Sequence, residues 1–432
     1  MTSGGWSKTG GEKWLASGNS IAEQPPGNGV AIRYCTARLT PRRPKPLHFT
    51  TRLGWRMQKR PERTESLPRG GLYRSFIGWS VRSRRENCGQ ELNAQAATLR
   101  TMRVVSLLPS ATECLLTITG SPANPRAQLV GRSHECDYPG SPGLEAVPIL
   151  TAAKTKFESS AQINQAVSAQ LATGESLYTL DVERLAELRP DVIITQDLCK
   201  VCSIDLNTVR GVVAKMSRRP LVVSLNPTTI EAVFDDMLAI GRAIGMEPQA
   251  AAVVGGLRER MYRAEEFVTP FAAAPTVAFL EWTDPIFAGG HWTPQLIERA
   301  GGLHPLNPTA APQSAGAAAG PIGQTLRAAG PSIRVPAEVV AAIRPEFVVV
   351  CPCGLSLEDA WRETRLLAEK PWWRELPAVR AGRVAVVDGN QMFNRPGPRL
   401  VDAFEWLVGW LNDRPEVMPE GFPWRQIDSP RS

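Results

Sequence analysis

Short apolar runs alternate with amphipathic stretches along the chain from Met102 onward. Residues 103–108, 191–195 and 221–225 form runs that are too short for helices and rich in Val and Ile, which indicates buried strands. Residues 160–171 instead repeat their apolar positions every three to four residues, as an amphipathic helix does. Strands and helices that alternate at this length predict an α/β fold with mostly parallel sheets flanked by helices.

The same two patterns recur through the rest of the chain. We expect further strands at residues 129–132, 147–150, 277–282, 347–351 and 383–388, and further helices at residues 182–188, 206–216, 294–300, 338–343, 357–369 and 400–411. Most of these strands are followed by a helix, which is typical of βα units.

Residues 229–268 interrupt this alternation with a nearly continuous helical pattern. Apolar residues keep a 3.6-residue period from Ile230 to Ile244, and residues 245–248 are the clear break. The alternation of strands and helices resumes after Pro270. We therefore expect two α/β lobes joined by a long helical segment, with an N-terminal lobe at 102–227, the link at 228–270 and a C-terminal lobe at 271–427.

The first predicted strand leads directly into a helix start. Pro109 ends the strand, and Ser110 and Glu113 have the spacing of a capping box. In that motif the serine oxygen and the carboxylate each satisfy a free backbone N–H of the first turn. The sequence therefore predicts a helix capped by Ser110.

The first 101 residues have a different character. They show no sustained helical or strand period, and they carry 18 Lys and Arg against 6 Glu and no Asp. The other residues carry 31 basic and 36 acidic side chains, so the net charge of +7 comes from this segment. We interpret residues 1–101 as a disordered extension or as a translated segment outside the fold. Targeting to an organelle by this basic segment is the alternative.

Composition also limits the class of protein. No apolar run reaches 18 residues, so no membrane-spanning helix is expected. No apolar segment follows a charged start, so we expect no secretory signal and a cytoplasmic protein. The basic segment lacks a helical basic face, and nucleic acid is not expected as a partner. Residues 307–334 are rich in Ala, Gly, Pro and Ser, which favours a surface loop.

Residues 133–138 are dense in side chains that can bind a ligand. His134 is one of four histidines in the chain, and Glu135 follows it. An imidazole suits cobalt, iron or zinc, and a carboxylate beside it can fix its tautomer. A polar loop with one hydrogen-bonded histidine is the alternative.

Two close cysteine pairs follow predicted strands. Cys199 and Cys202 lie near a helix start, which stabilises thiolates, and Cys351 and Cys353 end the strongest strand of the second lobe. If the two lobes face each other, the four sulfurs can converge on a soft metal such as zinc or iron. Chance burial of the cysteines is the alternative.

Two further clusters belong to the second predicted lobe. Trp282 and Trp292 offer flat faces on which a macrocycle can stack, with His291 between them. Arg395 and Arg399 can receive carboxylate or phosphate groups in bidentate fashion. A turn packed by two buried tryptophans, and ordinary turn chemistry at residues 388–389, are the alternatives.

Several motifs in order resemble one family. The residues Val-Ser-Leu-Leu-Pro-Ser-Ala-Thr-Glu, Gly-Arg-Ser-His-Glu-Cys-Asp-Tyr-Pro, Thr-Gln-Asp-Leu-Cys-Lys-Val-Cys, Gly-His-Trp-Thr-Pro and Arg-Pro-Gly-Pro-Arg-Leu resemble the cobalamin and iron-chelate branch of the periplasmic-binding-protein superfamily. More narrowly, the chain is similar to cysteine-bearing members of that branch without an export signal. The resemblance implies a class III fold, in which a rigid helix joins two lobes and the ligand is held between them.

The resemblance and the residues together lead to three functional hypotheses. The first is a soluble binding protein for cobalamin or a related corrinoid or metal chelate. Exported relatives pass their ligand to an ABC transporter, and we expect this chain to differ from them in lacking an export signal. The second is a metal or redox protein that uses the four cysteines. An enzyme ranks last, because the chain has no Ser-His-Asp order, phosphate loop or H-E-x-x-H motif.

Overall fold

The computed structural model describes residues 100–140, 143–154, 159–173, 176–197, 204, 206–269, 273–311 and 327–428. The chain divides into two units at Arg84 and Arg85, and all described residues lie in the second unit. Nearly all of the predicted extension, the Cys199–Cys202 pair and most of the loop at 307–334 lie outside the described residues.

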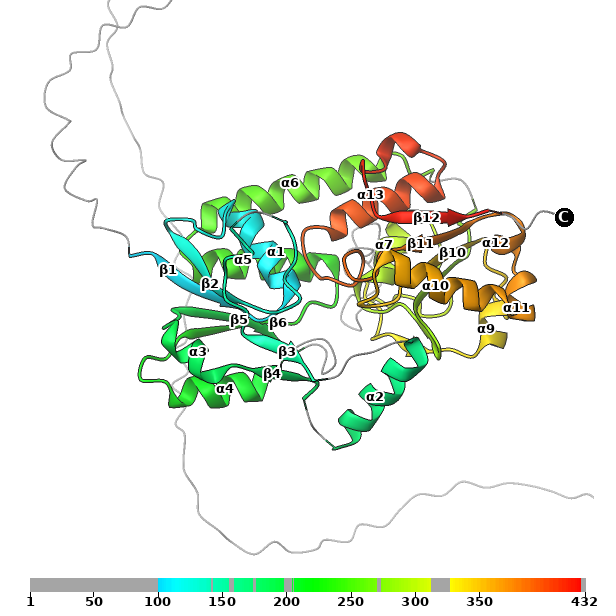
Figure 1. Ribbon diagram of the computed structural model, residues 1–432. Coiled ribbons are helices and arrows are strands. Elements are labelled where there is room, and N and C mark those ends of the chain that lie inside the picture. The colour runs from blue at the N-terminus through cyan, green and yellow to red at the C-terminus, as the bar shows by residue number, and fades with distance from the viewer. Residues whose placement is uncertain are drawn as a thin grey trace, which may run out of the picture. The chain divides into compact units, whose positions relative to one another are not determined.

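A four-stranded parallel sheet forms the centre of the N-terminal lobe. Its order is β2-β1-β5-β6, with β1 at Met102–Ser106, β2 at Ala127–Arg132, β5 at Val192–Gln196 and β6 at Leu221–Leu225. A separate antiparallel pair contains β3 (Thr151–Ala153) and β4 (Tyr178–Leu180). The helices of this lobe are α1 (Pro109–Thr119), α2 (Ser160–Thr173), α3 (Val182–Glu187) and α4 (Leu206–Lys215). Figure 1 shows this lobe in blue and green.

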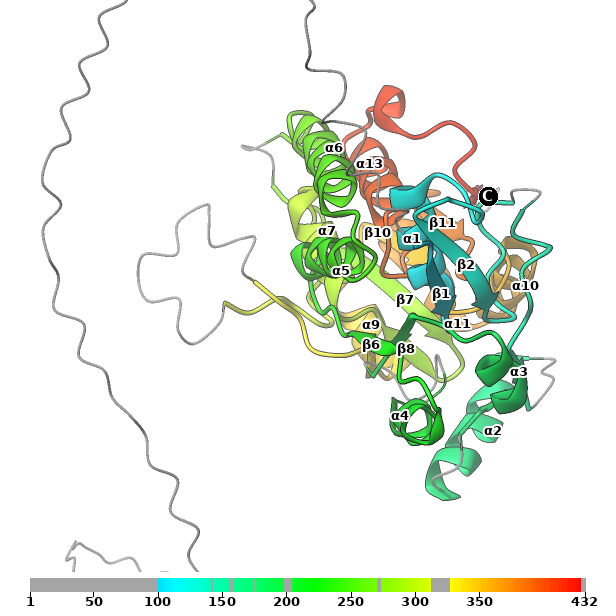
Figure 2. The same cartoon turned by 90° about the vertical axis from the view of Figure 1, so that its left-hand side faces the viewer.

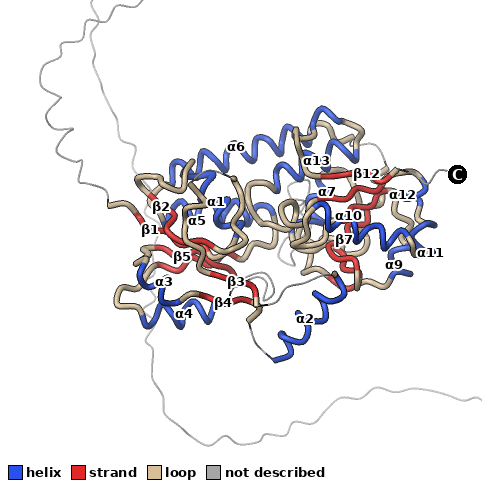
Figure 3. The backbone as a smooth tube through the Cα atoms, in the orientation of Figure 1, coloured by secondary structure: helices blue, strands red, loops and turns tan. Residues whose placement is uncertain are grey.

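A six-stranded mixed sheet forms the centre of the C-terminal lobe, in the order β12-β11-β10-β7-β8-β9. The parallel strands are β7 (Val277–Thr283), β10 (Phe347–Val350) and β11 (Val384–Val387). The antiparallel strands are β8 (Ile286–Ala288), β9 (Ile333–Arg334) and β12 (Trp424–Ile427). Its helices are α7 (Trp292–Arg299), α9 (Ala337–Ala342), α10 (Leu357–Ala368), α11 (Pro371–Arg374), α12 (Pro377–Arg380) and α13 (Leu400–Leu411), followed by the 3-10 helix η2 (Pro415–Val417). In Figure 3 the strands of the two sheets form two separate groups surrounded by helices.

A helical hairpin connects the two sheets. It consists of α5 (Ile230–Ala243) and α6 (Glu247–Glu265), which pack against each other. Gly245 ends α5 with a φ of 70°, a backbone conformation that suits glycine. The expected linking segment is therefore two helices, of which α6 contacts both α1 of the first lobe and α13 of the second. Arg260 of α6 pairs with Asp402 and Glu405 of α13.

One apolar core runs through both lobes and the hairpin. It joins Val104 and Leu115 to Phe234 of α5, and continues to Phe279 and Trp406 in the second lobe. Two smaller cores fill the opposite face of each sheet, one under α3 and α4 and the other under α9, α11 and α12. Figure 2 shows α4 on the far side of the first sheet from α5 and α6. Because close-packed cores resist shear, we expect the lobes to move only slightly against each other.

The predicted α/β fold with parallel sheets flanked by helices is confirmed, and the local differences have physical causes. The helix cap is Leu108, with Pro109 in the first turn and no side-chain cap, so the predicted capping box at Ser110 is wrong. The proline favours this position because its missing N–H is not needed there. The strand expected at 147–150 begins only at Thr151, and Ile149 makes an isolated bridge to Arg132. Pro148 removes a backbone donor within the expected run.

Among the described residues, no helix has both the length and the apolar character needed to cross a membrane.

Asp236 is a partly buried residue of α5. Its Oδ2 is buried without a hydrogen-bond partner in the described part of the chain, and its charge acts on Cys114 of α1. Burial raises the pKa of Asp236 to about 7, and the neighbouring Asp235 adds to the shift. As the pH rises, the unfolded chain therefore loses this proton first, and the folded state loses stability between about pH 4 and pH 7.

Asp236→Asn is accordingly expected to raise the free energy of unfolding at pH 8 by about 1–2 kcal/mol, because solvent partly screens this half-buried group. The gain should be mostly lost near pH 4, where the folded group is protonated and the unfolded group is about half protonated. Urea unfolding at the two pH values measures it. Asp235→Asn, a change of the exposed neighbour, is the control and should have a smaller effect. Equal gains at both pH values would contradict the assignment.

Candidate functional site

Loops that follow strands of the two sheets meet at the boundary between the lobes. The loop after β2 carries Asp137, and the loop after β11 carries Asn390, whose Nδ2 donates to Asp137 Oδ2 at 3.2 Å. In the same region Gly397 lies against α1, and a Cβ there would be 3.5 Å from the Ser110 carbonyl oxygen. In parallel sheets this edge, outside the carboxyl ends of the strands, is where ligands bind.

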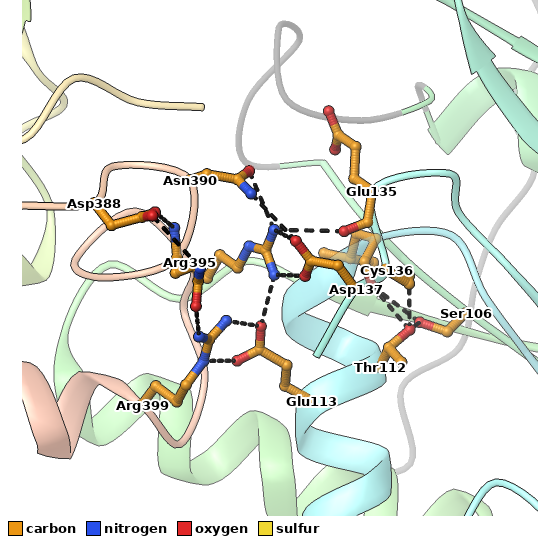
Figure 4. Close-up of polar contacts among 12 residues, drawn as sticks. Ser106, Thr112, Glu113, Glu135, Cys136, Asp137, Asp388, Asn390, Arg395 and Arg399 are labelled. Carbon is orange, nitrogen blue, oxygen red and sulfur yellow. Dashed lines mark hydrogen bonds and ion pairs between the residues drawn. The ribbon is translucent and has the colours of Figure 1, made fainter. Parts of the chain in front are cut away.

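A buried network of charges joins the lobes at this boundary (Figure 4). Glu113 of α1 is fully buried and accepts hydrogen bonds from Arg395 Nη1 at 3.0 Å, Arg399 Nη2 at 2.5 Å and Arg399 Nε at 2.9 Å. Arg395 also donates to Asp137 Oδ1 at 2.6 Å. The side chains of Arg395 and Arg399 are 5% and 4% exposed, whereas that of Asp137 is 48% exposed.

Further donors of the two arginines also have partners. Arg395 Nη2 donates to the Asn390 side chain at 3.2 Å and to the Glu135 carbonyl oxygen at 3.4 Å. Arg399 Nη1 donates to Gln391 at 2.7 Å, and its guanidinium lies 3.9 Å from the centre of the Tyr138 ring. Burial alone would raise the pKa of Asp137, but the hydrogen bonds and charge of Arg395 hold that pKa below its ordinary value.

Arg395 and Arg399, which we predicted to receive anionic ligand groups, bind carboxylates of the opposite lobe in the structure. Arg395 and Arg399 come from the loop before α13, and their carboxylate partners come from α1 and the loop after β2. A role of these arginines in binding anionic ligand groups stays a prediction.

His134 and Glu135 lie on the first lobe near this network. The Nδ1 of His134 is 2.8 Å from the hydroxyl of Thr151, which fixes the orientation of the ring, and Tyr178 lies beside it at 5.7 Å between ring centres. Burial lowers the pKa of His134 and therefore favours the neutral imidazole. Burial raises the pKa of Glu135, against the opposing effects of Arg395 and of a hydrogen bond with Tyr178. In Figure 4 the Glu135 carboxylate points away from the arginines.

The loop between β8 and α7 holds His291 in an unusual backbone conformation, with φ 53° and ψ −117°. Its N–H donates to the Gly330 carbonyl oxygen at 2.8 Å. The preceding Gly290 N–H donates to Glu281 Oε2 at 3.3 Å, and Ser332 donates to the same oxygen at 2.7 Å. Burial raises the pKa of Glu281 even though these hydrogen bonds oppose the shift.

The His291 ring is half-buried and stacks on Trp292, with 5.6 Å between ring centres. Within the described residues its Nδ1 is buried without a hydrogen-bond partner, and burial lowers its pKa. Backbone strain of this kind clusters at ligand sites, so this loop is a candidate binding site.

The two predicted tryptophans lie in different environments. Trp292 is part of the core, and its indole N–H donates to the Phe393 carbonyl oxygen at 2.6 Å. Trp282 is partly exposed, and its indole N–H donates to the Ser160 carbonyl oxygen of α2 at 3.3 Å. Thr283 also donates to the Ser160 hydroxyl at 3.0 Å, so α2 forms a second contact between the lobes. Stacking of a macrocycle on the pair stays a prediction.

Only half of the predicted cysteine site can be assessed, because Cys199 and Cys202 lie outside the described residues. Cys351 is fully buried, and burial raises the pKa of its thiol well above the ordinary value, with Cys353 and Asp388 adding to the shift. Cys353 is partly exposed. Across the described ranges, no group of three or more His, Cys, Asp or Glu could hold a metal ion.

Sequence reasoning missed the carboxylates that organise the lobe boundary and the His291 loop. Glu113 was interpreted as a cap, and Asp137 and Glu281 were given no role. A signal for Glu113 was present, since it lies between Ala111, Cys114 and Leu115 on a helix that is otherwise buried. A charged side chain in such a position requires a charged partner.

The comparisons with known proteins agree with this fold. The family model described as "Periplasmic binding protein" matches residues 143–390. A periplasmic heme-binding protein from Pseudomonas aeruginosa is 20% identical with a TM-score of 0.53, over 77% of this chain and 99% of that chain. The heme-binding protein BhuT, solved with two hemes, is 20% identical with a TM-score of 0.51, over 73% and 99%.

An ABC transporter substrate-binding protein from Listeria monocytogenes is 16% identical with a TM-score of 0.51, over 72% of this chain and 99% of that chain. No curated protein sequence matches the chain. At these identities the solved structures show a common fold.

Proposed function

This chain belongs to the periplasmic binding protein family, and we propose that it binds cobalamin or a related metal chelate at the boundary between its two lobes. The observation that carries this proposal is the His291 loop. The imidazole of His291 is half-buried, and its backbone is strained. Two hydrogen bonds hold the loop, one from the His291 N–H to the Gly330 carbonyl oxygen and one from the Gly290 N–H to the Glu281 carboxylate.

A neutral imidazole is the form that coordinates a metal. Burial lowers the pKa of both His134 and His291, which favours the neutral form of each ring. The imidazole of either His134 or His291 can supply one nitrogen ligand to a chelated cobalt or iron ion that has a free coordination position. We propose His291 as the first candidate and His134, with Glu135 beside it, as the second.

We propose a binding role and not an enzymatic one. The charged groups nearest the boundary are used in pairs that hold the lobes together, as in Glu113 with Arg395 and Arg399. The cysteine hypothesis is less favoured, because burial disfavours the thiolate of Cys351 that metal binding or redox chemistry needs.

Two wider aspects of the function are also proposals. One structural neighbour is described as an ABC transporter substrate-binding protein, and an ABC transporter is the proposed class of partner. A cytoplasmic location remains our expectation from the sequence.

Titration of the purified full-length chain with aquacobalamin and with hemin tests the proposal. We expect micromolar or tighter binding of at least one of them, with a change in the absorption bands when an imidazole replaces water on the metal. His291→Ala should weaken that binding by about tenfold or more, which corresponds to about 1.4 kcal/mol or more, and should abolish the spectral change.

His134→Ala is the parallel variant, and the melting temperature of each variant controls for folding. If the wild-type chain binds neither compound at micromolar concentration, the proposed function is wrong. If both variants keep the spectral change, the metal is bound without these imidazoles.

A further inference from the structure

We infer that this site selects metal chelates with uncharged, amide-bearing peripheries over chelates that carry carboxylates. The inference rests on the proposed function and concerns the charges that surround the site.

Four described segments carry the residues considered for the site: 133–140 after β2, 289–291 after β8, 351–356 after β10 and 388–399 after β11. Within these described segments, Arg395 and Arg399 are the only Lys or Arg. Both guanidinium groups are nearly fully buried and bound to Glu113. Both cations of these segments are therefore already paired with a protein carboxylate, and neither is free to pair with an anionic ligand group.

Displacing a protein carboxylate from the arginines would not help an anionic ligand. Glu113 is fully buried, so an anion that took its place would leave a carboxylate in the interior without a partner. Asp137 is more accessible, but its two oxygens accept bonds from Arg395 at 2.6 and 3.2 Å and from Asn390.

Further carboxylates lie within electrostatic range of this network. Arg395 acts on Glu135 and Asp388, and Glu281 and Asp388 act on Cys351. A ligand carboxylate would add like charge in a poorly solvated place.

An uncharged ligand amide, in contrast, can form hydrogen bonds with these groups without adding negative charge. An amide N–H donates to a carboxylate oxygen, and an amide oxygen accepts from side chains such as Asn390 and Gln391, which are both partly exposed. The carboxylate of Glu135, which points away from the arginines in Figure 4, is the acceptor we expect a ligand amide to reach.

Two ligands that share a corrin ring but differ in the charge of its side chains test this inference. One is cobyrinic acid, and the other is cobyrinic acid with its carboxyl groups converted to amides. We expect the full-length chain to bind the amide form at least about tenfold more tightly at pH 8, as measured by absorbance titration or calorimetry.

Glu135→Gln should reduce this preference, because it removes one of the carboxylates that repel the acid form. Glu145→Gln makes the same change at an exposed position of the same lobe and should leave the preference unchanged. Equal binding of the two forms, or tighter binding of the acid, would overturn the inference while the proposed function stands. Binding of neither form would overturn both.

Discussion

Glu113→Ala is expected to lower the free energy of unfolding by about 3–5 kcal/mol, because it leaves two buried cations without their shared partner. Arg395 and Arg399 are almost fully inaccessible, and three of their hydrogen bonds end on this one carboxylate. Chemical denaturation at neutral pH measures the loss.

Asp137→Ala is the matched control for this prediction. It also removes a partner of Arg395, but from a half-exposed position, so solvent can replace part of the lost contact. We expect a cost of about 1 kcal/mol or less. Similar losses for the two variants would show that burial of Glu113 does not set the strength of the network.

The same residue shows why part of the site was beyond sequence reasoning. Ser110 and Glu113 match a local capping pattern, but Pro109 starts the helix and Glu113 binds arginines 282 and 286 positions away. Local spacing carries no information on partners that distant. The inward position of a charge on a buried helix was the available signal that such a partner must exist.

The secondary structure was more predictable, because burial imposes its own period on the chain. The parallel strands β5, β7 and β10 are mostly buried, and the apolar run at the start of each strand marked it. The two residues of β9 are both exposed, and β12 is partly exposed at an edge of its sheet. Such edge strands have no apolar run, so nothing in their sequence distinguished them from loops.

The His291 site was only partly predictable from the sequence. The sequence identified its cluster through the paired glycines and the aromatic neighbours, but not the support beneath it. Glu281 and Ser332 are nine and 42 positions from Gly290 along the chain, and only the fold brings them to that loop. The glycine itself was the signal for close packing of backbone.

Gly290→Ala is therefore expected to disturb the site strongly. An added Cβ would lie 2.3 Å from the Ser332 nitrogen and 2.4 Å from the Pro331 carbonyl carbon, and both are backbone atoms that no rotamer change can move. The loop must shift, which should cost about 1–3 kcal/mol of stability. Because the shift moves His291 and breaks the bond from Gly290 to Glu281, we also expect ligand affinity to fall by about tenfold or more.

Gly330→Ala provides the control, since a Cβ at Gly330 meets nothing within 4 Å although the residue accepts the His291 N–H. It should keep both stability and affinity near the wild-type values. Thermal unfolding and titration with the corrinoid give the two readouts separately. A Gly290→Ala variant that is destabilised but binds normally would show that the loop supports the fold without placing His291 for the ligand. Loss of affinity with little loss of stability would instead locate the effect at the site itself.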